Sequence, residues 1–272
     1  MPRRGAPPAA SAESLAILDF VRDTLALADV ELRKLRRDPL ELLTRAIQPA
    51  LWLLIFGQVM GRLKAIPTGN VSYLTFMTPG ILAQSVLFIA IFYGISVIWE
   101  RDLGILQKLL ATPAPRTALV LGKALSAGVR GLSQGFIIYL LSLALHIPLR
   151  FRLGSIAGVA GFIILGSALF STFSLSVACL VRTRERFMGV GQVLTMPLFF
   201  TSNAIYPLSI MPPWLRALSK ANPLSYMVDA LRVLMVQGGE SVFGLGRDLA
   251  VLLLGLVFLV LITARLYPNV VR

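Results

Sequence analysis

The sequence is poor in the residue types that build most catalytic and metal sites. It contains one cysteine, Cys179, and one histidine, His146, among 272 residues. A single cysteine excludes an intrachain disulfide and a cysteine metal cluster. Neither paired carboxylates nor a Ser/His/Asp set occurs at a useful spacing. The sequence therefore predicts no catalytic residue, no metal site and no cofactor within this chain.

Charge is also scarce. Only 14% of the residues are charged, against about 25% in an average soluble domain, and 56% are hydrophobic. Apolar runs of about 20 residues recur along the chain, which is the length that crosses a bilayer. The 26 basic residues outnumber the 13 acidic ones. Because the basic residues are scattered over loops, they do not form the surface of a nucleic-acid-binding domain.

The apolar runs predict an all-α membrane protein with six transmembrane helices. The expected spans are 40–60, 73–99, 118–146, 155–181, 187–206 and 249–267. An even number of spans places both termini on one side. With the N-terminus inside, inner segments carry 17 basic residues and outer segments carry eight. This excess predicts an N-in, C-in topology, in which the loop arginines Arg182, Arg184 and Arg186 report topology only.

The first 37 residues are expected to precede the six-span domain, 38–272. Residues 1–13 carry arginines with no apolar core directly after them, so we expect a disordered tail and not a signal peptide. Residues 14–37 repeat leucines at heptad spacing and end in a basic run. This pattern predicts an amphipathic interface helix on an anionic membrane surface, with a coiled-coil arm as the alternative. Its expected contact residues are Leu25, Leu32, Arg33 and Arg36.

A charged segment, ERDLGILQKLLATPAPR at 100–116, separates the second and third expected spans. Two prolines end a short helix within it. The residues on one apolar face of that helix are Leu103, Leu106 and Leu110. The topology places this segment in the cytoplasm.

The charges of this segment favour a protein contact. Glu100 and Asp102 suit the start of the helix and Lys108 its C-terminal half. The leucines can fill an apolar groove while Glu100, Arg101 and Asp102 pair with a partner. The alternative is a juxtamembrane helix lying on lipid, but such a helix is expected to be more basic.

Prolines mark two short helices between the fifth and sixth spans. Within 207–222, Pro212-Pro213 begins an amphipathic helix, with Trp214 suited to the membrane interface. Asn222-Pro223 begins another helix of about 14 residues, which is too short to span. We expect a re-entrant helical hairpin on the outer face, with a plain extracellular amphipathic helix as the alternative. Asp229 and Arg232, three residues apart, are expected to pair.

The chain has no visible energy source for transport. The nearest match to an ATP-binding P-loop, at 122–124, lacks the hydroxyl residue and has Thr117 in place of the first glycine. No carboxylate lies deep in an expected span, and His146 lies at the outer end of the third. These absences disfavour a proton- or sodium-coupled carrier. A membrane domain of this kind needs a cytoplasmic motor.

Three segments together carry a resemblance to a known family. They are MTPGIL at 77–82, the 100–116 segment with GKAL at 122–125, and NPLSYMVDALR at 222–232. In this order, with six spans and an amphipathic N-terminal helix, they resemble the permeases of type-2 exporters in the ATP-binding-cassette superfamily. Within these, the chain looks most like the daunorubicin-resistance-type drug and lipid export permeases. The resemblance covers nearly the whole chain after residue 14.

The resemblance implies a role for each surface. The helix in 100–116 is expected to be a coupling helix on a separate ATP-binding subunit, which binds ATP and Mg²⁺, and residues 14–37 flank the same dock. The hairpin is expected to form an outer gate with Trp214, Asn222, Pro223, Tyr226, Asp229 and Arg232. The expected substrate path includes Gln48, Gln84, Phe88, Phe92, Gln192, Phe199 and Asn203. Simple packing is the alternative for these path residues.

The expected protein is the membrane subunit of a bacterial inner-membrane exporter and is not an enzyme alone. It would pair with a second permease and two ATP-binding subunits, in contact with lipid and with no nucleic acid. Its substrate would be hydrophobic or amphiphilic, such as a drug, lipid or glycolipid, moved out of the cytoplasm or inner leaflet. The alternatives are a non-transporting membrane scaffold and, in third place, a secondary carrier.

Overall fold

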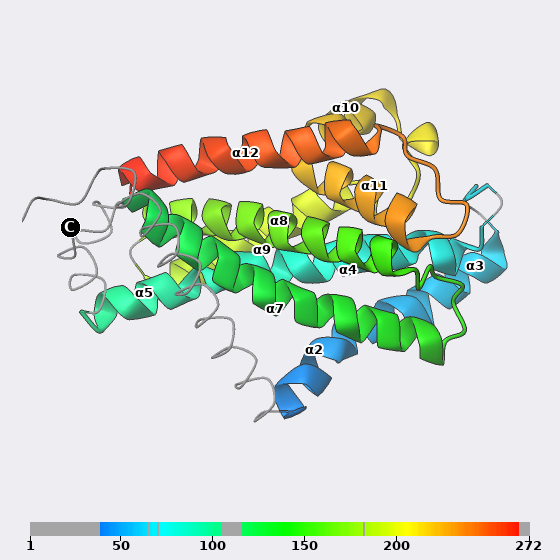
Figure 1. Cartoon of the computed structure of the whole chain (residues 1–272), viewed down its shortest axis with the longest axis horizontal. Coiled ribbons are helices and arrows are strands. Elements are labelled where there is room, and N and C mark those ends of the chain that lie inside the picture. The colour runs from blue at the N-terminus through cyan, green and yellow to red at the C-terminus, as the bar shows by residue number, and fades with distance from the viewer. Residues whose placement is uncertain (1–38, 65, 70, 105–115, 182, 267–272) are drawn as a thin grey trace, which may run out of the picture.

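The computed structural model describes residues 39–64, 66–69, 71–104, 116–181 and 183–266 (Figure 1). In these ranges the chain is helical apart from its connections, and pairing between extended segments is limited to one bridge, Leu149 with Val236. The prediction of an all-α fold is therefore confirmed for the described part. The expected tail 1–13 and interface helix 14–37 lie outside it.

Long helices lie side by side along the length of the molecule and form its body (Figure 1). They are α4 (Tyr73–Tyr93), α7 (Arg116–Ala144), α8 (Leu153–Ala178), α9 (Arg184–Phe200) and α12 (Leu245–Leu266). Helix α8 packs against α4, α7 and α12. Both α4 and α8 are apolar on all sides, as expected for helices surrounded by other helices or by lipid.

The first expected span is a helix with an internal π-helical turn. It consists of α2 (Pro39–Leu51), η1 (Trp52–Gly57) and α3 (Gln58–Leu63). Pro49 lies just before the turn and has no N–H to donate, which interrupts the regular hydrogen-bond ladder. Trp52 in this turn packs edge to face on Phe56 and Phe199, at 5.1 and 5.6 Å between ring centres. The turn thereby connects the first span to α9.

The second expected span is divided at Gly94. Helix α4 begins at Ser72, whose hydroxyl accepts a hydrogen bond from the Thr75 N–H, and α5 (Ile95–Asp102) follows Gly94. A Cβ atom at Gly94 would overlap the Ser174 side chain and the Phe187 ring. Only glycine therefore allows the α4–α5 joint to approach α8 and α9 this closely. The position of α5 depends on that contact.

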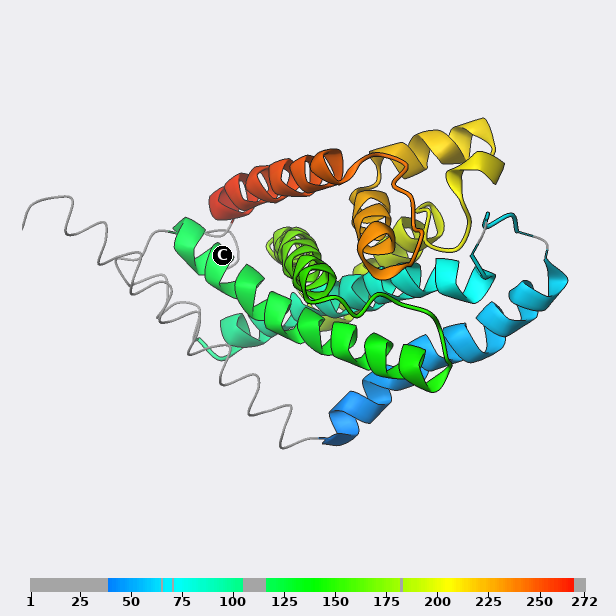
Figure 2. The ribbon, with the colours of Figure 1, turned by 45° about the vertical axis from the view of Figure 1, so that its right-hand side comes forward.

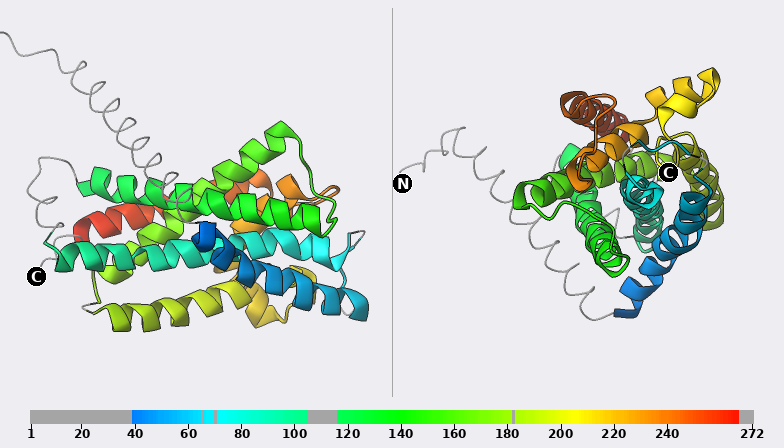
Figure 3. Two further views of the ribbon diagram at one scale, coloured as in Figure 1. Left: turned by 90° about the horizontal axis from the view of Figure 1, so that it is seen from below. Right: turned by 90° about the vertical axis from the view of Figure 1, so that its right-hand side faces the viewer.

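The body has two ends, which we name after α5 and α11 (Figures 1 and 3). At the α5 end, α5 and α8 finish and α7 and α9 begin. At the α11 end, α3 finishes, α4 begins, and the chain between α9 and α12 gathers. That chain forms η2 (Leu208–Ile210), α10 (Pro213–Ala221) and α11 (Pro223–Met235). Both α10 and α11 begin at proline, as the sequence predicted.

Five helical stretches in the described ranges are long and apolar enough to cross a membrane. They are Ala46–Leu63, Tyr73–Asp102, Val120–Ala144, Leu153–Ala178 and Leu245–Leu266. They agree with the first four expected spans and the sixth. The fifth expected span corresponds to α9, which has 17 residues and ends at Phe200, before the predicted Tyr206. It ends early because the chain at Ala204 passes directly over Gly80 of α4, where there is no room for a Cβ atom.

Helices α10 and α11 differ in burial. Helix α11 packs between α4, α8 and α12, and its buried side chains extend from Leu224 to Met235 (Figure 2). Helix α10 lies outside, and its Trp214 is 65% exposed. The largest apolar core is formed by α4, α8 and α11, so the chain between the last two long helices is part of the body.

Candidate functional site

At the α5 end, an ion pair ties the second span to α9. Asp102 accepts hydrogen bonds from Nη2 and Nε of Arg184, at 2.9 and 3.2 Å. The same guanidinium lies 3.6 Å from the centre of the Trp99 ring. Arg184 thus makes two kinds of contact with α5: its N–H groups donate to Asp102, and the face of its guanidinium covers Trp99. Lysine cannot reproduce this combination.

A second ion pair joins α5 to α7. Lys123 Nζ donates to Glu100 Oε2 at 2.5 Å, and both side chains are largely shielded from solvent. Arg101 donates to Asp102 on the same helix. The residues predicted to pair with another protein therefore have partners within this chain. We refer to Trp99, Glu100, Asp102, Lys123 and Arg184 as the α5 cluster.

The α5 cluster adjoins an exposed leucine. Leu103 is 66% exposed, and Gly104 follows it with a left-handed φ of 69°. The structure therefore presents one apolar side chain of the predicted coupling surface outward, beside fixed charges. The other predicted coupling residues lie outside the described ranges, as do the interface-helix residues: Leu106, Lys108, Leu110, Leu25, Leu32, Arg33 and Arg36.

The interpretation of Arg184 as a marker of topology alone is wrong. Its guanidinium contacts both Trp99 and Asp102, across 82 residues of chain in the latter case. No local pattern connects residues so far apart. Only the antiparallel packing of α5 and the start of α9 brings them together.

At the α11 end, Asp229 holds the connection that leads to α12. It is fully buried and accepts a hydrogen bond from the Ser241 hydroxyl at 2.6 Å. It also accepts from the backbone N–H groups of Val242 and Phe243, both at 3.0 Å. Hydrogen bonds to an ionised acceptor are stronger than neutral ones. This carboxylate therefore fixes the loop against α11.

Arg232, one turn further along α11, contacts other groups. Its Nη2 donates to the carbonyl oxygen of Asn203 at 2.8 Å and its Nε to that of Phe76 at 3.5 Å. Its guanidinium lies 3.9 Å from the centre of the Phe76 ring. Arginine is not deprotonated in proteins at neutral pH, so this buried guanidinium is positively charged. The predicted direct pairing of Asp229 with Arg232 is wrong, because each side chain binds other partners.

Asn222 caps α11, as predicted. Its side-chain oxygen accepts from the Leu224 N–H at 2.9 Å. Its amide nitrogen donates to the carbonyl oxygen of Leu198 at 2.6 Å and to Thr201 Oγ1 at 3.0 Å. Pro223 occupies the first helical position, where a missing N–H has no cost. The cap therefore also joins α11 to the end of α9.

The other predicted gate residues are Tyr226 on α11 and Trp214 on α10. Tyr226 donates to the carbonyl oxygen of Lys220 at 2.6 Å and stacks on Phe243 at 4.5 Å between ring centres. Trp214 points to the surface, where it has the exposure expected of an interfacial tryptophan. The gate residues thus form one connected region, with Trp214 at its margin.

A second carboxyl group lies against Asp229. Asp248, in the first turn of α12, is fully buried and within hydrogen-bonding reach of Asp229. Its two oxygens accept no hydrogen bond from any described residue. The sequence alone missed this contact, because an acidic residue in a first helical turn is ordinary.

The residues predicted for the substrate path lie in different environments. Gln48 and Gln192 are exposed, Phe88 and Phe92 are half-buried, and the buried ones are Gln84, Phe199 and Asn203. Phe199 packs on Trp52, which fits the packing alternative. The structure does not gather the predicted path residues into one site.

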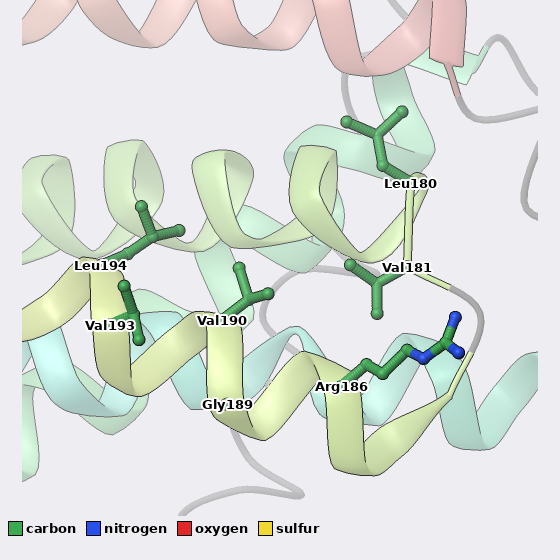
Figure 4. A pocket seen from close by; sticks show the side chains of 7 residues that line it. All are labelled: Leu180, Val181, Arg186, Gly189, Val190, Val193 and Leu194. Atoms are coloured by element: carbon green, nitrogen blue, oxygen red, sulfur yellow. The ribbon is translucent and has the colours of Figure 1, made fainter.

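Two apolar grooves open on the surface of the body. The first follows α2 and η1, has a volume of about 460 Å³, and is lined by Ile47, Gln48, Leu51, Trp52, Ile55, Phe56, Val59 and Met60. The second lies beside α9 and has a volume of about 660 Å³. Figure 4 shows its apolar side chains along the helix, with Arg186 at one end. Apolar surface on this scale marks contact with lipid or another protein.

The chain matches the family model of the ABC-2 type transporter over residues 22–236. It is 31% identical to transport permease ycf38 of Cyanophora paradoxa over 217 residues, which are 79% of this chain and 74% of that protein. It is 28% identical to the daunorubicin resistance ABC transporter permease protein DrrB1 of Streptomyces coeruleorubidus over 240 residues, 85% of this chain and 81% of that protein.

A further relative is the inner membrane transport permease YadH of Escherichia coli K12, which is 28% identical over 192 residues, 68% of this chain and 72% of that protein. The membrane-length helices agree with these matches. The chain belongs to the ABC-2 type transporter family and is a multi-pass permease subunit of an ABC transporter, which is not catalytic by itself.

Proposed function

We propose that this chain is the membrane subunit of an ATP-driven exporter, coupled through segment 100–116 to a separate ATP-binding subunit. The observation that carries the proposal is the α5 cluster at the end of a long helical stretch. Tyr73–Asp102 contains 30 residues, or about 45 Å at 1.5 Å per residue, whereas the hydrocarbon core of a bilayer is about 30 Å thick. Helix α5 therefore projects beyond that core, where its ion pairs hold it in place.

The α5 cluster suits the transmission of movement. A motor shifts a membrane domain only if it binds two arrangements of that domain with different affinity. The pairs Glu100–Lys123 and Asp102–Arg184 connect α5 to α7 and α9. A displacement of the docked segment would therefore reach two further helices, and Leu103 offers an apolar contact for the motor.

The proposed topology has six spans with both termini in the cytoplasm, and α9 is the fifth span. Its 17 residues lie at the short limit for crossing a bilayer. The excess of basic residues on the segments at the α5 end supports its cytoplasmic placement. The burial of α11 between α4, α8 and α12 supports a re-entrant hairpin over a helix lying on the surface.

The proposed assembly contains two permeases, identical or sibling, and two ATP-binding subunits that bind ATP and Mg²⁺. The two apolar grooves offer surface for a second permease. A hydrophobic or amphiphilic substrate, such as a drug, lipid or glycolipid, fits a path with few polar groups. The relative named for daunorubicin resistance supports a drug. The relative named as an inner membrane permease supports a bacterial inner membrane.

The coupling role is tested by Leu103→Asp and Leu106→Asp in the complex with its ATP-binding subunit. Both variants are expected to insert normally and to lose permease-stimulated ATP hydrolysis and transport by about fivefold or more. The matched control is Leu153→Asp, the same substitution at the opposite end of the body, where Leu153 is 82% exposed. Normal coupling in both variants would contradict the proposal. Transport without ATP would instead favour a secondary carrier, and failure to bind an ATPase would favour a scaffold.

A further inference from the structure

A small pocket lies at the α11 end, apart from the two apolar grooves. Its volume is about 250 Å³. Its walls come from three parts of the chain: the first turn of α4 with the connection before it, the segment after α9, and α11 with the loop that follows it. The right-hand view of Figure 3 faces this end of the body. Two of its lining residues, Arg232 and Asn203, were expected in the outer gate and the substrate path, but neither expectation assigns a ligand to this pocket.

Arg232 supplies a buried positive charge to the pocket. It is only 6% exposed. The guanidinium has five N–H groups, and its hydrogen bonds in the described structure come from Nη2 and Nε alone. Nη1 donates to no described residue. The Phe76 ring stacks against the guanidinium plane and lines the same pocket, so the remaining donors are held in a fixed direction.

Asn203 supplies an amide that has no hydrogen-bond partner among the described residues. It is 1% exposed and lines the pocket, and neither its side-chain oxygen nor its side-chain nitrogen forms a hydrogen bond within the described ranges. A buried amide of this kind normally has partners. Its backbone carbonyl accepts from Arg232, so the amide and the guanidinium are neighbours.

The nearby acidic groups leave this guanidinium available. Asp229 is occupied by Ser241 and two backbone N–H groups, and it does not bond to Arg232. Glu240 lines the pocket but is exposed, so water screens its charge. A planar fork of N–H groups beside an amide donor matches the oxygens of a carboxylate or phosphate.

We propose that this pocket binds an oxyanion, a carboxylate or phosphate group, between the guanidinium of Arg232 and the side-chain amide of Asn203. The group belongs either to a free solute or to a lipid headgroup. The pocket opens at the extracytoplasmic side if the proposed topology holds, but the binding itself does not depend on the topology or on transport.

The experiment measures the melting temperature of the full-length purified chain in detergent. The free probes are sodium phosphate and sodium acetate, with sodium chloride at equal ionic strength as the reference. The lipid probe is phosphatidylglycerol, compared with phosphatidylcholine. A ligand that binds only the folded chain raises the melting temperature. Stabilisation by phosphate or acetate identifies a free solute, and stabilisation by phosphatidylglycerol alone identifies a headgroup; both support the pocket.

The decisive variant is Asn203→Ala. Because its amide forms no hydrogen bond with any described residue, its removal breaks no internal hydrogen bond that the structure describes, but the affinity for the probe is expected to fall by about tenfold. The matched control is Gln134→Ala, which removes another buried amide whose nitrogen has no partner in the described part of the chain and which lies outside the pocket. The control is expected to keep the affinity of the unmodified chain.

Two further variants test the charges. Glu240→Gln removes a repelling carboxylate and is expected to tighten binding several-fold. Arg232→Gln is expected to abolish binding of the probe. If that variant fails to fold, the comparison of Asn203→Ala with Gln134→Ala still tests the proposal. The proposal is overturned if no probe stabilises more than its reference, if Asn203→Ala binds as tightly as Gln134→Ala, or if Glu240→Gln binds more weakly.

Discussion

Asp102 at the end of α5 accepts two hydrogen bonds from Arg184, the first residue of α9, 82 residues later in the chain. The arginine also covers the Trp99 ring. The pair is partly exposed, so its contribution to stability is small. The pair instead joins α5 to α9 at the end of the body where we propose that the ATP-binding subunit docks.

Breaking this pair should affect coupling more than folding. Arg184→Ala is expected to leave the melting temperature nearly unchanged and to lower permease-stimulated ATP hydrolysis by about fivefold. Arg184→Lys should recover only part of the activity, because lysine keeps the charge and loses the planar fork. Equal loss of stability and coupling would assign the pair a purely structural role. The measurements are thermal unfolding and ATPase assays of the reconstituted complex.

Gly94→Ala should disturb the joint between α4 and α5. The added methyl group meets Ser174 and Phe187, and overpacking of this kind costs about 1–3 kcal/mol. Gly161→Ala on α8 is the matched control, because nothing lies near its added Cβ atom. Thermal unfolding of both variants checks this. An unchanged melting temperature in Gly94→Ala would show that α5 does not depend on this contact.

Exchanging the charges of Asp229 and Arg232 should rescue nothing. The double variant Asp229→Arg/Arg232→Asp places a cation against the N–H groups of Val242 and Phe243, and a carboxylate against two carbonyl oxygens. Each single variant is expected to lose folded protein, and the double variant should lose at least as much. The outcome is measured as the yield of monodisperse protein. Recovery of that yield in the double variant would show that Asp229 and Arg232 pair directly.

Asp248→Asn should be tolerated, whereas Asp229→Asn should not. An amide at position 248 can donate to the Asp229 carboxylate, which lies within reach, and it adds no repulsion. Asparagine at position 229 weakens three hydrogen bonds to a charged acceptor, for a loss of about 2 kcal/mol or more. Chemical unfolding of the two variants compares them. Greater destabilisation by Asp248→Asn would contradict this view of the carboxyl pair.

The helices could be predicted because their signals are local. Pro213 and Asn222-Pro223 begin α10 and α11 where the sequence placed them, and the apolar runs located five membrane-length helices within a few residues. The end of α9 was misplaced, since the crossing of Ala204 over Gly80 is a contact between distant segments.

The side-chain partners were harder to predict. Asp229 and Arg232 have the spacing of a helical ion pair, but a later loop and the carbonyl of Asn203 offer better partners. The spacing of two residues along a helix indicates that their side chains can meet. It does not indicate whether other segments of the chain supply competing hydrogen-bond partners. The role of Arg184 was missed for the same reason. The exposed Gln48 and buried Gln84 also show that polarity in a span does not separate a surface residue from an enclosed one.

The most direct test of the coupling role is a cross-link from α5 to the ATP-binding subunit. The only native cysteine, Cys179, is buried, so a Cys179→Ala background allows single reactive thiols. In that background, Leu103→Cys carrying a photo-activated cross-linker is predicted to bond to the ATP-binding subunit, and Leu153→Cys at the other end is not. Cross-linking at Leu153→Cys, or no cross-linking at Leu103→Cys in an active complex, would contradict the docking of the ATP-binding subunit at α5.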